Sequence, residues 1–311
     1  MRHHQAAPPD AATVIAASPD CPVASTAVGD ARRGIHTLRG EPCFLERPDG
    51  RLAYDDAGQG PLVVMVPGLG DLRTEYRYLA PKLATAGYRV VTLDLRGHGQ
   101  SSVGWPDYTS AALGSDVVAL VRHLDAGPAH LVGTSMGAAA VAWAAADAPD
   151  RVGSLSLIGP FVREVPPASA FKAAPQRLMM RVGFASPWGP WLWGMAYASF
   201  HVRRPTDFDA YRDALVANLR EPGRLDAVKG MIFATKSDVE ARLAEVKAPT
   251  LVIMGEADPD FADPRAEAKT VARLLRGAVH MVPGAGHYPH VEAPDDVAPP
   301  LLRFLGAREG V

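Results

Sequence analysis

Short apolar runs and amphipathic stretches alternate along most of the chain. Residues 88–95 are almost continuously apolar, which predicts a strand that is buried on both faces of a sheet. Residues 109–124 instead suit a helix. Strands that alternate with helices indicate a parallel sheet joined by right-handed crossovers. The expected strands are residues 51–56, 61–66, 88–95 and 151–158, and the expected helices are residues 76–86 and 109–124.

Two segments depart from this alternation. Residues 161–247 lack clear strands, contain helix-like pieces separated by Pro and Gly, and hold 11 of the chain's 22 Phe, Trp and Tyr residues. Residues 1–43 contain no aromatic residue and are rich in Ala, Pro and Asp, so they bury too little surface to fold alone. We therefore expect a flexible N-terminal tail (1–43), an α/β core (44–160 and 248–311) and a helical insertion (161–247).

The segment Gly133-Thr134-Ser135-Met136-Gly137 carries the most specific chemical pattern in the chain. A short apolar strand runs into this segment, and an Ala-rich helix follows it. Such a turn strains the serine and brings together the residues two before and two after it, so both must be glycine. This is the sequence context of a nucleophile elbow, in which the helix start presents free N–H groups. The competing interpretation is a serine that only caps the helix.

A serine nucleophile needs a base and an acid that orients the base. Residues 250–258 form an apolar run that ends in an acidic turn at Asp258, and a later apolar run ends at the Gly-flanked His287. Both side chains follow the carboxyl end of an expected strand, where open parallel sheets place their sites. Asp260 competes with Asp258, which lies nearer the strand end. The order Ser135, Asp258, His287 therefore predicts a catalytic triad.

Five motifs lie in residues 63–70, 94–101, 133–137, 255–259 and 286–287, within a region of roughly residues 45 to 306. Together they resemble the α/β-hydrolase superfamily, in the capped branch that includes esterases, non-haem haloperoxidase-like enzymes and C–C bond hydrolases. The resemblance implies a mostly parallel central sheet flanked by helices, with a helical cap inserted at residues 161–247. It also implies structural roles for His98 and Asp94. Asp263, which Pro264 follows, instead has the signature of a helix N-cap. His290 competes with His287, but it would begin the last helix and is expected to be a solvated or packed side chain.

The resemblance extends to the oxyanion hole, with one departure. The family usually has His-Gly where this chain has Pro67-Gly68. Proline has no N–H, but the family's donor is the residue after the glycine. The implied oxyanion hole is therefore the backbone N–H groups of Leu69 and Met136, and the missing histidine leaves the rigidity of the loop unexplained.

We expect a serine hydrolase that cleaves a carboxylic ester of a small hydrophobic substrate through an acyl-enzyme, without a cofactor or metal. A cofactor-free C–C bond hydrolase or a perhydrolase would share every motif. Epoxide hydrolases and haloalkane dehalogenases of this fold use Asp at the elbow, so Ser135 argues against both. A ligand receptor on a degenerate hydrolase fold is disfavoured because the triad is complete. The aromatic residues of the cap could line the substrate pocket or only hold the cap on the core: Trp188, Trp191, Trp193, Tyr197 and Phe200.

Composition limits the possible partners. The 311 residues have 48% hydrophobic and 21% charged residues, typical of a globular protein, and a net charge of −2 that offers no basic field for nucleic acid. No apolar run reaches the roughly 18 residues needed to span a bilayer. Cys21 and Cys43 are too few for a disulfide framework, so we expect free thiols and a cytoplasmic location. The sequence leaves the oligomeric state open.

Overall fold

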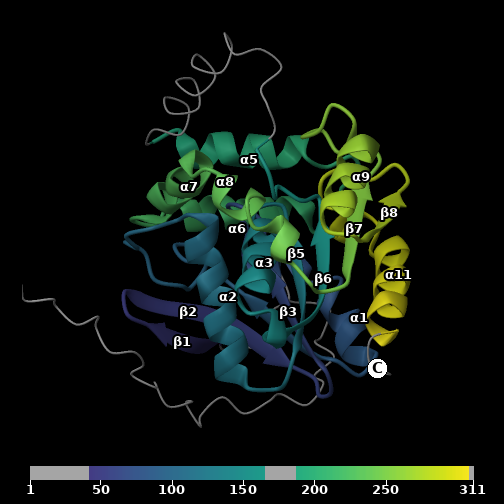
Figure 1. Ribbon diagram of the computed structural model, residues 1–311. Helices are drawn as coiled ribbons and strands as arrows, with labels where there is room; N and C mark the ends of the chain where they lie inside the picture. The colour runs from purple at the N-terminus through teal and green to yellow at the C-terminus, as the bar shows by residue number, and fades with distance from the viewer. Residues whose placement is uncertain (1–41, 165–186, 308–311) are drawn as a thin grey trace, which may run out of the picture.

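The computed structural model describes residues 42–164 and 187–307, which form an eight-stranded sheet between two layers of helices (Figure 1). The strand order is β1-β2-β4-β3-β5-β6-β7-β8. β1 and β2 pair antiparallel with each other, β2 pairs antiparallel with β4, and the remaining pairs are parallel. The strands are β1 (Cys43–Arg47), β2 (Gly50–Ala57), β3 (Leu62–Val66), β4 (Arg89–Leu93), β5 (Ala129–Thr134), β6 (Val152–Ile158), β7 (Thr250–Gly255) and β8 (Ala278–Val282).

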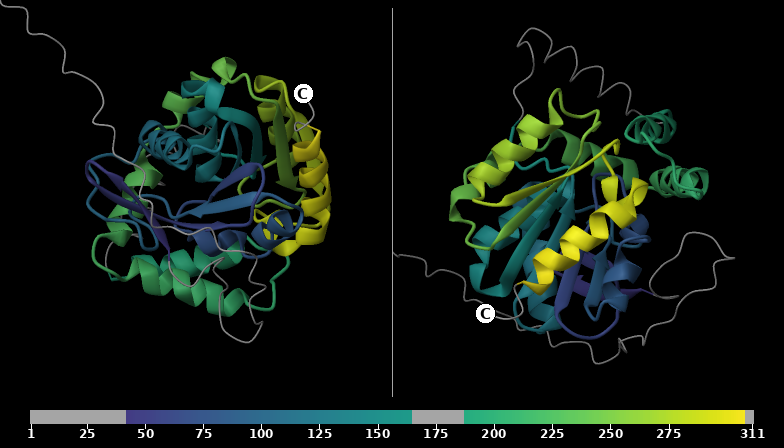
Figure 2. Two further views of the ribbon diagram at one scale, coloured as in Figure 1. Left: turned by 90° about the horizontal axis from the view of Figure 1, so that it is seen from below. Right: turned by 90° about the vertical axis from the view of Figure 1, so that its right-hand side faces the viewer.

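Alternate residues of the buried strands serve two separate hydrophobic clusters. Val64 belongs to the cluster under α2, α3 and α9, whereas Met65 belongs to the cluster under α1 and α11. Because successive strand side chains point to opposite faces, a continuous apolar run supplies both faces of the sheet. Figure 2 shows α11 crossing one of these faces. The core helices are α1 (Ala80–Thr85), α2 (Ser110–Leu124), α3 (Met136–Asp147), α9 (Pro264–Leu274), α10 (Pro289–Glu292) and α11 (Pro294–Gly306).

The remaining helices gather over the end of the sheet where β3, β5 and β6 finish (Figure 1). All four lie within the segment expected to form a cap, and α5 packs against α6. They are α5 (Gly189–Ser199), α6 (Phe208–Leu219), α7 (Arg224–Phe233) and α8 (Ser237–Glu240).

Most expected elements are present, with two differences. The helix expected over residues 76–86 is present only over Ala80–Thr85, because the chain first forms a 3-10 turn at Arg73–Tyr76 and then the shorter α1. Pro81 explains the break, since proline lacks an N–H and is suited to the first turn of a new helix. The antiparallel hairpin of β1 with β2 was not expected, because β1 is short and partly polar.

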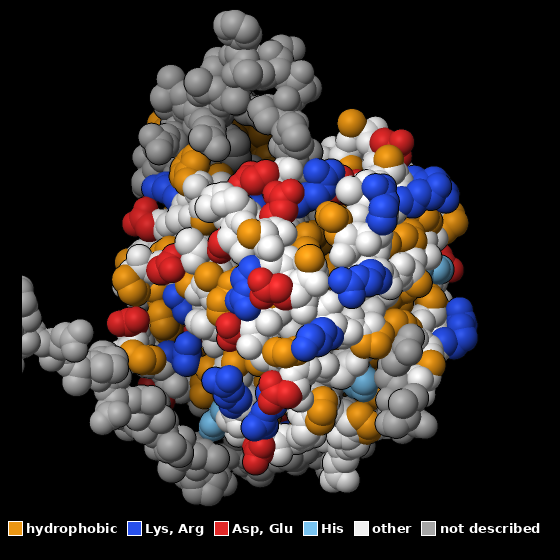
Figure 3. All heavy atoms as spheres, in the orientation of Figure 1, with side chains coloured by type: hydrophobic (Ala, Val, Ile, Leu, Met, Phe, Trp, Pro, Cys, Tyr) orange, Lys and Arg blue, Asp and Glu red, His pale blue; other side chains and the backbone are white. Residues whose placement is uncertain are grey.

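The thiol expectation is wrong at Cys43, which is disulfide-bonded, with its partner outside the described residues. The argument from free thiols for a reducing compartment therefore fails. The expected tail lies almost wholly outside the described residues as well. No helix in the described ranges is both long and apolar enough to cross a membrane. On the face shown in Figure 3, acidic and basic side chains are interspersed, in keeping with the small net charge.

Candidate active site

Ser135 occupies a strained turn between β5 and α3. Its backbone φ is +54°, one of few positive values outside glycine among the described residues. A Cβ on Gly137 would lie 2.2 Å from the carbonyl oxygen of Val66, and a Cβ on Gly133 would lie 2.5 Å from the carbonyl oxygen of Gly137. Real Cβ atoms do not approach backbone so closely, so both positions require glycine. The strand–turn–helix geometry expected at this motif is present.

His287 and Asp258 meet at the carboxyl end of the sheet. His287 Nδ1 lies 2.8 Å from Asp258 Oδ2, and both residues are almost fully buried. Burial by itself lowers the pKa of His287, but the carboxylates of Asp258, Asp260 and Glu75 outweigh burial and raise it to about 9. The ring is therefore held with its Nδ1 proton directed at Asp258.

Asp260, the competing acid, lies farther from the imidazole. Its Oδ2 is 3.5 Å from His287 Nδ1, and its backbone N–H donates to Asp258 Oδ1 at 3.0 Å. Burial raises the pKa of Asp260, against the attraction of His287. The geometry thus brings Asp258 into direct contact with His287 and leaves Asp260 beside the pair.

Ser135 and His287 line one cavity of about 350 Å³ between the sheet and the cap. Its walls are mostly apolar, with aromatic rings from Phe161, Trp193 and Phe200. The Phe161 and Phe200 rings lie 5.9 and 5.7 Å from the imidazole of His287, measured between centroids. The cavity therefore places hydrophobic surface directly beside the serine and the histidine.

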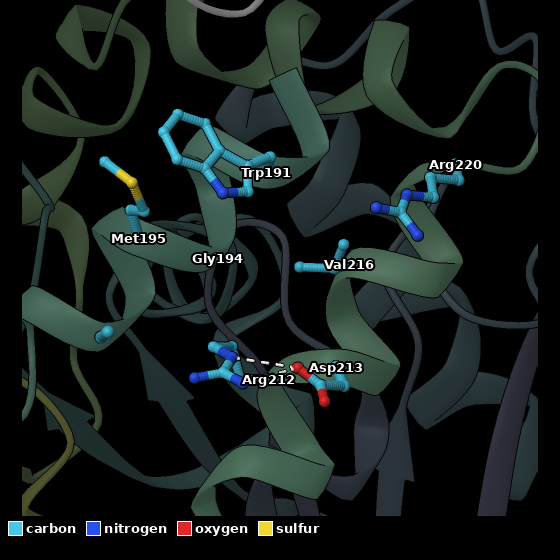
Figure 4. A pocket seen from close by; sticks show the side chains of 8 residues that line it. Trp191, Gly194, Met195, Arg212, Asp213, Val216 and Arg220 are labelled. Carbon is cyan, nitrogen blue, oxygen red and sulfur yellow. Dashed lines mark hydrogen bonds and ion pairs between the residues drawn. The ribbon is translucent and has the colours of Figure 1, made fainter. Parts of the chain in front are cut away.

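The other cap aromatics do not line this cavity. Tyr197 is fully buried in a cluster with the ring of Tyr288, whereas Trp188 and Trp191 are 63% and 59% exposed. Trp191 borders a second cavity of about 500 Å³ between α5 and α6. Arg212 also lines this cavity (Figure 4). Neither Ser135 nor His287 lines that second cavity, so its greater volume does not connect it with the expected triad.

The loop after β3 is fixed by side chains through its backbone N–H groups. The N–H of Gly68 donates to Glu75 Oε2 at 2.7 Å, and the N–H of Gly70 donates to His98 Nε2 at 3.0 Å. Burial lowers the pKa of His98 to about 4, so its ring is neutral and can accept this bond. Between them, the N–H of Leu69 has no acceptor among the described residues. Glu75 and His98 therefore supply the loop rigidity that the family's missing histidine left unexplained.

Met136 is the first residue of α3, so its N–H has no partner within the helix. Met136 and Leu69 both line the cavity that contains Ser135. A Cβ built on Gly68 would lie 3.3 Å from the Cβ of Ser135, so the loop packs directly against the serine. The two expected oxyanion donors thus border the same space as the expected nucleophile.

A buried acidic cluster under this loop was not expected. Asp71 accepts hydrogen bonds from Tyr288 Oη at 2.7 Å and Tyr211 Oη at 3.1 Å, and Glu75 Oε1 lies 2.9 Å from His290 Nε2. Burial raises the pKa of Asp71 well above its usual value and that of Glu75 to about 7, and burial lowers the pKa of His290 to about 3. In the sequence, two acids four residues apart after a Gly-rich loop were the only indication of this cluster.

The side chains that were expected to be structural are hydrogen-bonded to, or packed against, other parts of the core. Asp94 accepts from the backbone N–H and the guanidinium of Arg73. Asp263 caps α9 by accepting from the N–H of Ala266 at 2.9 Å. His290 is completely buried, so of the two expected environments, solvated or packed, the packed one holds.

Asp258, Asp260 and His287 also bring three potential metal ligands within 4.8 Å of one another. The described part of the chain has no other such group of His, Cys, Asp and Glu. The hydrogen bond from His287 Nδ1 to Asp258 already uses the histidine atom that would face a metal, and a metal would have to displace its proton.

The comparisons with known proteins agree with this architecture. A family model described as "alpha/beta hydrolase fold" matches residues 61–294. The chain is 29% identical over 271 residues to pyrrolizixenacetamide deacetylase of Xenorhabdus hominickii, covering 83% of this chain and 95% of that protein. It is 32% identical over 270 residues to 2-hydroxy-6-oxo-6-phenylhexa-2,4-dienoate hydrolase of Burkholderia cepacia, covering 82% and 91%. A thermophilic esterase from Thermogutta terrifontis superposes with a TM-score of 0.70 at 26% identity, covering 86% of this chain and 99% of the esterase.

Proposed function

Because this chain belongs to the α/β hydrolase fold family, we propose that it is a serine hydrolase that cleaves a carboxylic ester of a small hydrophobic substrate. One observation carries the proposal. Ser135, held in a positive-φ turn, shares a cavity with His287, whose Nδ1 is hydrogen-bonded to Asp258. A nucleophile, a base and an orienting acid in this arrangement suit acyl transfer.

In the proposed reaction, His287 takes the proton of the Ser135 hydroxyl as its Oγ attacks the ester carbonyl carbon. Asp258 holds the imidazole and stabilises its positive charge. The N–H groups of Leu69 and Met136 stabilise the oxyanion, each contributing about 3–4 kcal/mol in comparable sites. His287 then protonates the departing alcohol, and a water molecule that it activates releases the acid and restores Ser135.

The volume and lining of the cavity favour a small hydrophobic substrate. It encloses about 350 Å³ and its aromatic walls lie beside the reacting groups. Pockets of this volume and polarity bury most of a small ligand's surface. The acyl or ring group of the substrate would therefore pack against Phe161, Trp193 and Phe200.

Hydrolysis of a C–C bond is the second candidate, on one specific observation. The relative from Burkholderia cepacia, at 32% identity, is named for hydrolysis of 2-hydroxy-6-oxo-6-phenylhexa-2,4-dienoate. The same serine, base and oxyanion donors would serve that reaction. Loss of the dienoate's absorbance on mixing with the enzyme would favour this candidate over the ester.

The ester proposal is tested with p-nitrophenyl esters from acetate to dodecanoate. We expect turnover that Ser135→Ala lowers about 10⁴-fold or more, since loss of the nucleophile leaves only binding and oxyanion stabilisation. Ser115→Ala, which removes a hydroxyl on α2 outside the cavity, is the matched control.

A fluorophosphonate provides a second readout that needs no substrate. It should label the wild type and not the Ser135→Ala variant. If neither turnover nor labelling depends on Ser135, the assignment of the nucleophile is wrong. Labelling without ester turnover would direct the search to the C–C substrate.

A further inference from the structure

One lysine side chain lines the mostly apolar cavity that contains Ser135 and His287. Lys236, just before α8, is 9% exposed, and it is the only Lys or Arg among the described residues that line the cavity. Its Nζ donates to the carbonyl oxygen of Ala234 at 3.1 Å. An ammonium has three N–H donors, and among the described residues this one is hydrogen-bonded to a carbonyl and to no carboxylate, although the charges of Glu164 and Asp238 act on it. A buried cation with a single neutral partner is unfavourable until an anion binds it.

Two acids, Glu164 and Asp238, act on the Lys236 ammonium through their charge while their oxygens accept hydrogen bonds from other groups. Glu164 accepts from the backbone N–H of Lys236 and from Thr235 Oγ1, and Asp238 accepts from the N–H of Ala111 at 2.9 Å. Burial lowers the pKa of Lys236 below its usual value, although the charges of Glu164 and Asp238 act in the opposite direction. They support the ammonium at a distance without contacting it.

The other charged groups that line the cavity within the described ranges make no ion pair with Lys236. Asp260 faces His287 at 3.5 Å and does not reach Lys236. The charges of Asp258 and Asp260 are directed at the imidazole that they hold. The cavity therefore has two carboxylates around one imidazole at the end near Ser135, and an ammonium without a direct carboxylate contact among the described residues in its wall.

We propose that Lys236 binds a carboxylate of the substrate, so that the natural substrate is an ester with one carboxylate apart from the scissile carbonyl. A single ammonium balances a monoanion, whereas a phosphate monoester of about −1.5 to −2 would leave excess negative charge in an apolar cavity. The inference rests on the proposed ester hydrolysis and adds the substrate class. It makes Lys236 a specificity residue, with Ser135 and His287 still performing the reaction.

The test compares esters that differ only in this charge. On the acyl side, mono-p-nitrophenyl glutarate is paired with p-nitrophenyl valerate. On the alcohol side, 4-acetoxybutyrate is paired with butyl acetate. The wild type should prefer the anionic member of at least one pair in kcat/KM by about 10- to 100-fold, the range for a hydrogen bond to a charged group. Lys236→Met, which keeps the length of the side chain, should reduce that ratio toward one, and Lys236→Arg should retain most of it.

Lys229→Met is the matched control, because Lys229 is an α7 lysine paired with Asp226 outside the cavity, and its loss should leave the ratio intact. No anionic preference in either pair, or a preference that survives Lys236→Met, overturns the proposal while ester hydrolysis stands. Protection against fluorophosphonate labelling gives an independent readout. Glutarate should slow labelling of the wild type and not of Lys236→Met, and equal slowing of both would also overturn the proposal. If the fluorophosphonate labels nothing, the proposed function itself has failed.

Discussion

At the scale of single residues, two carboxylates share one imidazole nitrogen unequally. Asp258 makes a direct 2.8 Å hydrogen bond to His287, and Asp260 lies 3.5 Å away with part of its side chain facing solvent. Both charges favour the protonated ring, but only Asp258 also fixes its orientation. Replacing each acid by its amide should therefore have different effects on the rate.

Asp258→Asn is expected to lower kcat about 10³- to 10⁴-fold, and Asp260→Asn less than about tenfold. The raised pKa of His287 also predicts how the rate depends on pH. A general base must be neutral, and the pKa of His287 is raised to about 9, so kcat/KM should rise with pH up to that region. Removing either carboxylate should lower the pKa of His287, so the rise of kcat/KM with pH should occur at lower pH. Initial rates across pH for the three proteins check this, and a larger loss with Asp260→Asn would reverse the assignment of the acid.

The same pKa shift affects stability. The His287 pKa in the folded protein lies above its usual 6.5, so the stabilisation from the imidazolium–carboxylate contact is fully present below about pH 6.5. It is lost as pH rises through about 9. The protein is thus expected to give up some stability in the pH range where its base becomes active.

At the scale of elements, the turn between β5 and α3 depends on a close approach of backbone to backbone. Gly137 lies where a Cβ would meet the carbonyl oxygens of Val66 and Pro67 at 2.2 and 2.4 Å. Backbone on both sides of that contact belongs to packed elements. There is no flexible side chain to move aside.

Gly137→Ala is therefore expected to destabilise the fold by about 3 kcal/mol or more, at the upper end for overpacking. Gly306→Ala in α11 is the matched control, because a Cβ there meets nothing within 4 Å, and it should change stability by less than about 1 kcal/mol. Urea unfolding of the two variants and the wild type measures the difference. Similar midpoints for both variants would mean that the start of α3 can move away from the end of β3 at this point.

The sequence predicts the elements that are encoded locally. The positions of Ser135, Asp258 and His287 at one end of the sheet could be predicted because each comes within a few residues of the end of an apolar run, and the glycines around Ser135 restrict that turn to one geometry. The role of Glu75 could not be predicted, because its burial depends on packing with residues far away in the chain, including His290. Lys236 likewise has no distinctive sequence context, and only its burial in the cavity wall marks it.

At the scale of the whole molecule, polar contacts attach the cap to the core close to the loop after β3. Arg77 makes two hydrogen bonds to Asp207, at 2.6 and 2.9 Å, and its guanidinium lies 4.0 Å from the ring centroid of Tyr211. Tyr211 in turn donates to Asp71 in the acidic cluster under the loop. Cap position and loop position are therefore linked through one continuous set of contacts.

Arg77→Met is expected to lower the free energy of unfolding by about 2–3 kcal/mol, less than for a fully buried pair because Asp207 is partly exposed. Arg212→Met, at an exposed pair on α6, should cost less than about 1 kcal/mol. Although burial opposes it, Arg77 lowers the pKa of Asp207, so the stabilisation is present above about pH 4 and is lost as pH falls further. Urea titrations at pH 7 and below pH 4 measure this, and an Arg77→Met penalty that persists at the lower pH would contradict it.

The distance along the chain between Ser135 and His287 also has a consequence in time. The strand that presents the serine pairs with β3 and β6, which are early in the chain, but the imidazole follows β8, 152 residues after the serine. At a synthesis rate of about 5–20 residues per second, the proposed base is made roughly 8–30 s after the proposed nucleophile. A growing chain therefore has a serine hydroxyl with nothing to remove its proton. The proposed ester hydrolysis would therefore begin only when the last strand joins the sheet, and incomplete chains on the ribosome would be inert toward esters.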